Sequence, residues 1–192
     1  MGRDKASLPF GPNETMLQRV VRLVGEVVPA ERIVCVAAPG QAIPRLAGPV
    51  SVVHDPKPHA GPLAGLATGL VAMPQGADAV FVTACDMPLL LPGFMERMFE
   101  LLGEHQIAAP HDGDCWQPLA AVYRTGVRPQ VDGLLAGGER SVVAVLEACD
   151  TRRVPAEELR DIDSELTSLI ACNTPADYCR ALQVAGFATP RV

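Results

Sequence analysis

The sequence predicts an α/β domain whose sheet is mostly parallel, and two observations support this fold class. Short runs rich in β-branched residues alternate with longer segments in which apolar residues recur at helical spacing. In addition, 48% of the 192 residues are hydrophobic, which is enough for one sizeable core without metals or disulfides. The sequence contains no repeat, low-complexity tract or long linker. We therefore expect a single domain over residues 1–192.

Five short apolar runs have the composition of strands. They cover residues 33–37, 50–53, 79–83, 107–109 and 119–123. The order of the predicted elements is unusual at the N-terminus, because the chain begins with a loop and continues directly into a helix. A doubly wound sheet normally begins with a buried strand followed by a ligand-binding turn.

The segments between these runs have the periodicity and end signals of helices. We expect the first helix over 14–28, with a broad apolar face, and others over 62–73, 94–102 and 142–149. Pro62 stands in the first turn of the second helix, where a missing N–H costs nothing. Ser141 is a candidate N-cap, and Thr174-Pro175 followed by Asp177 predicts the start of a last helix.

The net charge and the spacing of the cysteines disfavour several classes of function. The net charge of -6 argues against binding to nucleic acid, which clustered Lys and Arg normally mediate. The six cysteines form no Cys-x-x-Cys and have no His at zinc-finger spacing, so reduced thiols are expected. No apolar run approaches the roughly 18 residues that span a bilayer, and the first residues do not lead into a signal peptide. We expect a cytoplasmic protein without a membrane partner.

The clearest chemical signal is Asp86, which follows an apolar strand and precedes Pro88. Ligands of open α/β sheets bind beyond the carboxyl ends of the strands, so this carboxylate should face the ligand. Mg²⁺ prefers one or two protein oxygens together with substrate phosphates, and Asp86 is therefore a candidate metal ligand. A turn-capping role explains the local pattern equally well.

A second acidic residue, Asp55, also ends an apolar strand, and a loop rich in proline and glycine follows it up to Gly61 and the next helix. A helix N-terminus favours anions, and glycine lets the backbone approach a ligand closely. Asp55 could accept hydrogen bonds from a nucleobase or ribose. His54 and His59 have no partner at a catalytic spacing, so we interpret them as solvated loop residues.

The third signal lies at the beginning of the chain, where two residues separate Lys5 from Gly2. A Lys beyond a glycine-containing loop can neutralise phosphate oxygens as a point charge. Taken alone, this segment is interpreted more simply as a charged N-terminus.

Five motifs in order carry a resemblance to a known family. The chain resembles the molybdenum cofactor guanylyltransferases, the MobA family, in the segments Met1-Gly2-x-Asp4-Lys5-Ala6, Asp55-x-x-Pro58-x-x-Gly61-Pro62-Leu63-Ala64-Gly65, Cys85-Asp86-Met87-Pro88, Pro118-Leu119-x-Ala121-x-Tyr123 and Asn173-Thr174-Pro175-x-Asp177. Each motif is weak alone, but five at compatible separations are specific.

The resemblance implies a three-layer, Rossmann-like fold of the nucleotide-diphospho-sugar transferase type. It also implies transfer of GMP from GTP to molybdopterin with release of pyrophosphate, and Mg²⁺ as cofactor. In this interpretation Lys5 and Gly2 contact the phosphates, Asp55 and Gly61 belong to the guanosine site, and Asp86 binds Mg²⁺. Lys5 and Asp86 are then the catalytic residues. GTP and molybdopterin are the implied partners, and a molybdoenzyme or its chaperone is a further candidate.

Two other residues have weaker assignments. Asn173 is a candidate contact for the ligand or metal, although Asn-Thr-Pro is also a good helix start and we favour that structural role. Arg140 follows a glycine-rich turn and is a candidate contact for a phosphate of molybdopterin.

The sequence departs from the family at its beginning. Family members start with an apolar strand and a Leu-x-Gly-Gly-x-Ser-x-Arg loop, and this sequence starts at the Met that follows them. An internal Met chosen as the start of a longer protein is the interpretation we favour over a true loss of that segment. A chain without the segment should have two strands facing each other across a gap, bind GTP weakly and turn over slowly.

Other functions remain open on the sequence alone. The nearest are transferases that use CTP or act on a sugar phosphate. A different class is a nucleotide-binding protein without catalysis that regulates or scaffolds cofactor insertion. A dinucleotide-dependent oxidoreductase is disfavoured, because no Gly-x-Gly-x-x-Gly follows any strand.

Overall fold

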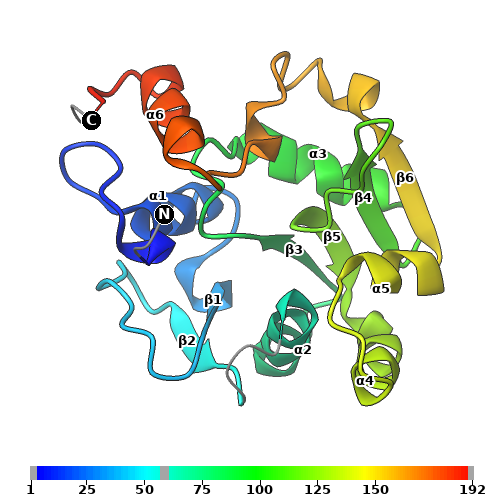
Figure 1. Ribbon diagram of the computed structural model, residues 1–192. Helices are drawn as coiled ribbons and strands as arrows, with labels where there is room; N and C mark the ends of the chain where they lie inside the picture. The colour runs from blue at the N-terminus through cyan, green and yellow to red at the C-terminus, as the bar shows by residue number, and fades with distance from the viewer. Residues whose placement is uncertain (1–3, 57–60, 190–192) are drawn as a thin grey trace.

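The computed structural model describes residues 4–56 and 61–189, which form an α/β structure (Figure 1). Gly2 and His59, both named above, lie outside the described residues. The strands are β1 (Val34–Ala37), β2 (Ser51–His54), β3 (Ala79–Thr83), β4 (Ile107–His111), β5 (Ala120–Arg124) and β6 (Thr151–Pro155). The α-helices are α1 (Met16–Val24), α2 (Pro62–Ala72), α3 (Pro92–Leu102), α4 (Arg128–Ala136), α5 (Val143–Ala148) and α6 (Pro175–Val184). Short 3₁₀ helices are η1 (Lys5–Ser7), η2 (Ala30–Arg32), η3 (Thr125–Val127), η4 (Ala156–Leu159) and η5 (Thr167–Leu169).

The strands form two sheets. β1 and β2 are a parallel pair, and the other four strands are ordered β3-β5-β4-β6. β5 runs antiparallel to both of its neighbours, whereas β6 runs parallel to β4. β3, β4 and β6 therefore point the same way, and their carboxyl ends meet at one edge of the sheet.

Two apolar layers cover the four-stranded sheet, one on each face. Ile107 on β4 and Tyr123 on β5 pack with α2, α4 and α5, whereas their neighbours Ala108 and Val122 pack with α3 on the opposite face. This alternation follows from the period of two in a strand. The three-layer α/β architecture predicted from the sequence is thereby confirmed.

Most helix and strand positions agree with the predicted ones, and the differences have local causes. α1 begins at Met16, because Thr15 and Gln18 form a capping box that fixes its start. Thr174 caps α6, as predicted. Ser141 is not at the N-cap position of α5, which Val142 occupies, but the Ser141 hydroxyl accepts a hydrogen bond from the Val143 N–H at 3.2 Å. α4 and β6 were not predicted.

A cavity of about 640 Å³ separates β1 from β3. These two strands belong to different sheets, and residues of both line the cavity together with apolar side chains of α1 and α2. The gap lies beside η1 and the loop after β3, since Ala6 and Cys85 are also in its wall. The interrupted sheet therefore borders the edge at which the candidate site lies.

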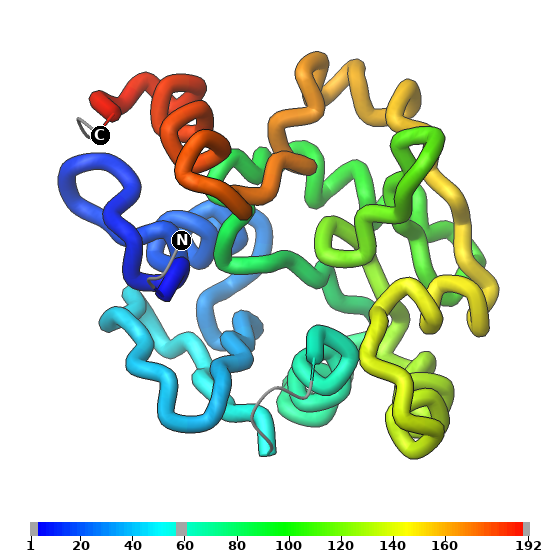
Figure 2. Tube along the Cα trace, viewed as in Figure 1, coloured from blue at the N-terminus to red at the C-terminus, as the bar shows by residue number. Residues whose placement is uncertain are grey.

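The loop before α1 and the C-terminal segment after α6 lie side by side (Figure 2). The loop before α1 packs on α6 through Phe10, whose ring makes edge contacts with those of Tyr178 and Phe187. The Tyr178 hydroxyl donates a hydrogen bond to the Pro9 carbonyl. Across residues 4–56 and 61–189, no helix combines the length and apolar character that crossing a bilayer requires.

Candidate active site

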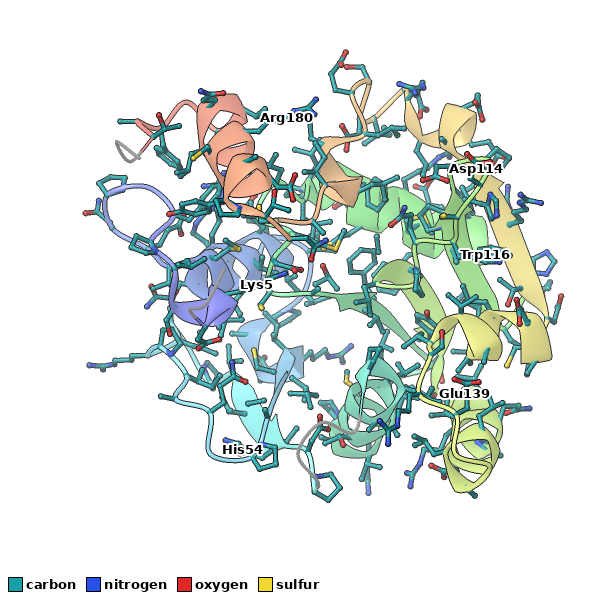
Figure 3. The ribbon with its side chains drawn as sticks, in the orientation of Figure 1. Lys5, His54, Asp114, Trp116, Glu139 and Arg180 are labelled. Atoms are coloured by element: carbon teal, nitrogen blue, oxygen red, sulfur yellow. The ribbon has the colours of Figure 1, made fainter. Side chains whose placement is uncertain are left out.

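Three residues predicted from the sequence meet at the carboxyl edge of the sheet. The Lys5 Nζ atom lies 2.7 Å from Asp86 Oδ2 and 2.8 Å from Asn173 Oδ1. These residues come from η1, from the loop after β3 and from the segment before α6, and Figure 3 shows Lys5 beside that loop. A cation, a carboxylate and an amide oxygen thus share one position where α/β sheets bind ligands.

The burial of the Lys5–Asp86 pair suits an electrostatic role. The Lys5 side chain is 30% exposed and that of Asp86 is 14% exposed, so the pair is shielded from solvent yet still accessible. Partial burial strengthens a charge interaction compared with one in open water. A polyphosphate that enters here would meet a cation already held in place.

The loop that carries Asp86 is held from two sides. The Asp86 carbonyl accepts a hydrogen bond from the Cys172 N–H at 2.8 Å, next to Asn173. On the other side, Arg19 Nε donates to the Pro88 carbonyl at 2.7 Å. Sequence reasoning missed Arg19, because its spacing on α1 gives no sign of a partner 69 residues away.

Lys5 is held by a separate set of hydrogen bonds. Asp4 caps η1, with its Oδ1 atom 3.3 Å from the Ala6 N–H. The same oxygen accepts a hydrogen bond from Gln41 Nε2 at 2.8 Å, and the Gln41 Oε1 atom accepts one from the Ala38 N–H at 3.0 Å. The loop after β1 therefore supports the turn on which Lys5 stands.

Asp55 lies at the end of β2 and faces α2. Its Oδ1 atom accepts a hydrogen bond from the Thr68 hydroxyl at 2.8 Å, and its N–H donates to the Ala37 carbonyl at 2.9 Å. The structure does not place Asp55 in direct contact with Lys5 or Asp86. Asp55 lies at the carboxyl edge of the parallel pair β1–β2, and its predicted contact with the nucleoside stays a prediction.

Gly61 precedes α2 and has a backbone conformation that only glycine adopts readily, with φ 87° and ψ 171°. A Cβ atom here would lie 3.2 Å from the Arg140 carbonyl oxygen. That carbonyl also accepts the Leu63 N–H at 3.1 Å, so the loop before α5 is packed on the N-terminus of α2. Gly61 therefore permits a close approach of two backbone segments, and its predicted contact with the nucleotide stays a prediction.

The thiols near the site are unsuited to nucleophilic roles. Burial raises the pKa of Cys85 to about 11, and the neighbouring Asp86 carboxylate adds to this shift. Burial and the same carboxylate raise the pKa of Cys172 to about 11. Both side chains are then protonated at neutral pH and are poor nucleophiles.

Within residues 4–56 and 61–189, no cluster of three or more His, Cys, Asp or Glu side chains could form a metal site by itself. An ion held by one carboxylate and by substrate phosphates, which is how Mg²⁺ is commonly bound, needs no such cluster.

The layered sheet, with the Lys5–Asp86 pair at its carboxyl edge, defines an α/β protein with a candidate anion-binding site. The chain belongs to the family of MobA-like NTP transferase domains, whose family model matches residues 1–154. A relative from Mycobacterium avium (strain 104), named "Probable molybdenum cofactor guanylyltransferase", is 37% identical over 96% of this chain and 89% of its own length. A relative of the same name from Mycobacterium tuberculosis (strain ATCC 25618 / H37Rv) is 36% identical over 84% of this chain and 80% of its own.

Solved structures show the same fold. The molybdopterin-guanine dinucleotide biosynthesis protein A from Archaeoglobus fulgidus has a TM-score of 0.73 at 22% identity, covering 96% of this chain and 92% of that one. The 2-C-methyl-D-erythritol 4-phosphate cytidylyltransferase from Thermus thermophilus has a TM-score of 0.72 at 17% identity, covering 95% and 94%. Because the fold is shared by proteins with different names, the fold alone does not select the nucleotide.

Proposed function

We propose that this chain transfers GMP from GTP to molybdopterin and releases pyrophosphate. The observation that carries the proposal is the cluster of Lys5, Asp86 and Asn173 at the carboxyl edge of the sheet. The names and the high coverage of the relatives support guanosine as the nucleoside and molybdopterin as the acceptor.

The chemistry joins two anions, so charge neutralisation and alignment must supply most of the catalysis. A phosphate oxygen of molybdopterin attacks the α-phosphorus of GTP and forms the new P–O bond. The bond from that phosphorus to the bridging oxygen breaks, and pyrophosphate leaves with its electron pair. In this scheme Lys5 neutralises charge that builds on the departing pyrophosphate.

Asp86 has the donor chemistry that Mg²⁺ requires. Within the described residues, the Asp86 Oδ1 atom accepts no hydrogen bond. Its Oδ2 atom accepts one, from Lys5 Nζ. Asp86 and the substrate phosphates would hold the ion, with Asn173 Oδ1 as a neighbouring oxygen. When bound, Mg²⁺ supplies positive charge to the phosphate oxygens. The protein supplies the fixed position of the carboxylate through the hydrogen bonds from Cys172 and Arg19.

Replacing Lys5 with Met tests the role of the charge, because Met keeps the apolar stem. We expect GTP affinity to fall by about ten- to a hundredfold, since a charge-assisted hydrogen bond contributes about 1.5–3 kcal/mol. Asp86→Asn should abolish the Mg²⁺ dependence of GTP binding in isothermal titration. Arg97→Met is the matched control, because the partly exposed Arg97 on α3 pairs only with Glu100 among the described residues, and it should leave binding unchanged.

The reaction itself is tested by pyrophosphate release from GTP and molybdopterin. We expect slow release in the unaltered chain, because it lacks the N-terminal loop of the family, with dependence on Mg²⁺ and loss in Asp86→Asn. Binding of GTP with no release would instead support a nucleotide-binding protein without catalysis. Faster release from CTP than from GTP would assign the chain to cytidylyl transfer.

A further inference from the structure

At the far end of the same sheet edge, three side chains form a second cluster. His111 ends β4, Trp116 lies in the loop that follows it, and Arg153 is on β6. Arg153 Nη2 is 2.8 Å from His111 Nδ1 and 2.9 Å from Nε2. The Trp116 ring meets the His111 ring edge-on, with 4.9 Å between centroids, and the Arg153 guanidinium carbon lies 5.9 Å from the centre of the Trp116 ring.

The loop between β4 and β5 is fixed by its own hydrogen bonds. Asp112 Oδ1 accepts the Cys115 N–H at 2.8 Å and the Asp114 N–H at 3.2 Å, while its Oδ2 atom accepts from Gln117 Nε2. These backbone donors lower the pKa of Asp112. Trp116 is therefore held in place before any ligand arrives, as preorganised binding surfaces are.

The two consecutive arginines of β6 differ in a way that points to a ligand. Arg152 forms an ion pair with Glu158 at 2.9 Å on one face of the sheet. Arg153 points to the other face and has no carboxylate partner among the described residues, only the rings of His111 and Trp116. A planar guanidinium held in this way can receive an anionic group and stack on a flat one.

We propose that Trp116 and Arg153 bind the heterocyclic end of the second substrate, with its ring against Trp116 and its polar edge hydrogen-bonded to the Arg153 guanidinium. This inference rests on the proposed function and extends it, because it assigns a binding site to the end of the acceptor that does not react. β6 is three positions from β3 in the sheet, which corresponds to roughly 14 Å at the usual strand spacing. A phosphate-bearing heterocycle can span this distance, with its phosphate near Asp86 and its ring against Trp116. Figure 3 shows Trp116 and Lys5 well apart.

The test uses a feature of the composition, because Trp116 is the only tryptophan of the chain. Its fluorescence therefore reports on this cluster alone. We expect pterin-6-carboxylate, a flat anionic pterin, to quench Trp116 fluorescence saturably after correction for absorbance. GTP with Mg²⁺ should leave the fluorescence unchanged.

Variants separate this inference from the proposed function. Arg153→Ala should raise the Kd for the pterin about tenfold or more, because a hydrogen bond to a charged group is lost. Arg153→Lys should lie between the two, and Arg128→Ala, which removes an exposed arginine on α4, should match the unaltered chain. GTP affinity from calorimetry should be the same in all four proteins.

Three outcomes would overturn the inference while the proposed function stands. They are an absence of saturable quenching, an equal Kd in Arg153→Ala and the unaltered chain, and quenching by GTP itself. Failure of the proposed function would appear elsewhere, as absent GTP binding or absent pyrophosphate release.

Discussion

Replacing Arg19 with Ala is expected to lower the free energy of unfolding by about 3 kcal/mol, because Arg19 contacts three segments of the chain. The Arg19 side chain is only 16% exposed and forms an ion pair with Glu14 at 3.0 Å. Its Nε atom donates to the Pro88 carbonyl, and its guanidinium carbon lies 4.9 Å from the Phe10 ring centre and 5.6 Å from that of Phe187.

The magnitude follows from those contacts. A hydrogen bond to a charged donor contributes about 1.5–3 kcal/mol. Each cation–π contact adds about 0.5–1 kcal/mol at a partly exposed position. The contacts share one side chain, so they are not additive, and the lower part of the summed range is the expected loss.

Arg22→Ala is the matched control, because Arg22 is one turn further along α1 and contacts the same Glu14 carboxylate. Its side chain is 50% exposed, so its loss should cost less than about 1 kcal/mol. Urea unfolding followed by far-UV circular dichroism measures both variants. Equal losses for Arg19→Ala and Arg22→Ala would refute the view that Arg19 joins the N-terminal loop, α6 and the Asp86 loop.

Three further substitutions test single contacts. Gly61→Ala should destabilise by about 2 kcal/mol or more in urea unfolding, because alanine strains this backbone conformation and meets the Arg140 carbonyl; an unchanged midpoint would contradict the structure. Thr68→Val removes the hydroxyl that orients Asp55 and should cost about 1 kcal/mol, with weaker GTP binding by calorimetry. Asp177 has a pKa below 3.8, chiefly because it accepts the N–H of the N-cap residue, so its contribution to stability is present above pH 3.8 and is lost as the pH falls through the lowered value. The difference in urea midpoint between Asp177→Asn and the unaltered chain should therefore be largest near neutral pH and disappear in acid.

Elements defined by local signals could be predicted from the sequence. The start of α6 is an example, because Thr174, Pro175 and Asp177 are adjacent and act on one helix turn. β6 shows the opposite case, since Arg152 and Arg153 give it a polar sequence without strand character. It exists because it pairs in register with the buried strand β4, and that pairing is invisible in its own residues.

The candidate site was predictable only in part for the same reason. Asp86 and Lys5 carry chemistry that their types and positions suggest, and the structure brings them together across 81 residues. The supports of the site were not predictable, because Arg19 and Gln41 act through single hydrogen bonds to distant segments. Such contacts depend on packing between α1, the loop after β1 and the loop after β3, for which no local pattern exists.

The distribution of charge explains how an acidic protein can take a polyanionic substrate. With a net charge of -6, the chain repels anions at distances where only its overall charge is felt. Screening removes most of this repulsion beyond about 8–10 Å at moderate salt, so the groups in contact with the phosphates decide binding. Lys5, held at the edge by Asp86 and Asn173, is placed to be such a group. One cation held in this way can serve a small polyanion such as a nucleoside triphosphate, whereas a long polyanion needs many clustered Lys and Arg side chains.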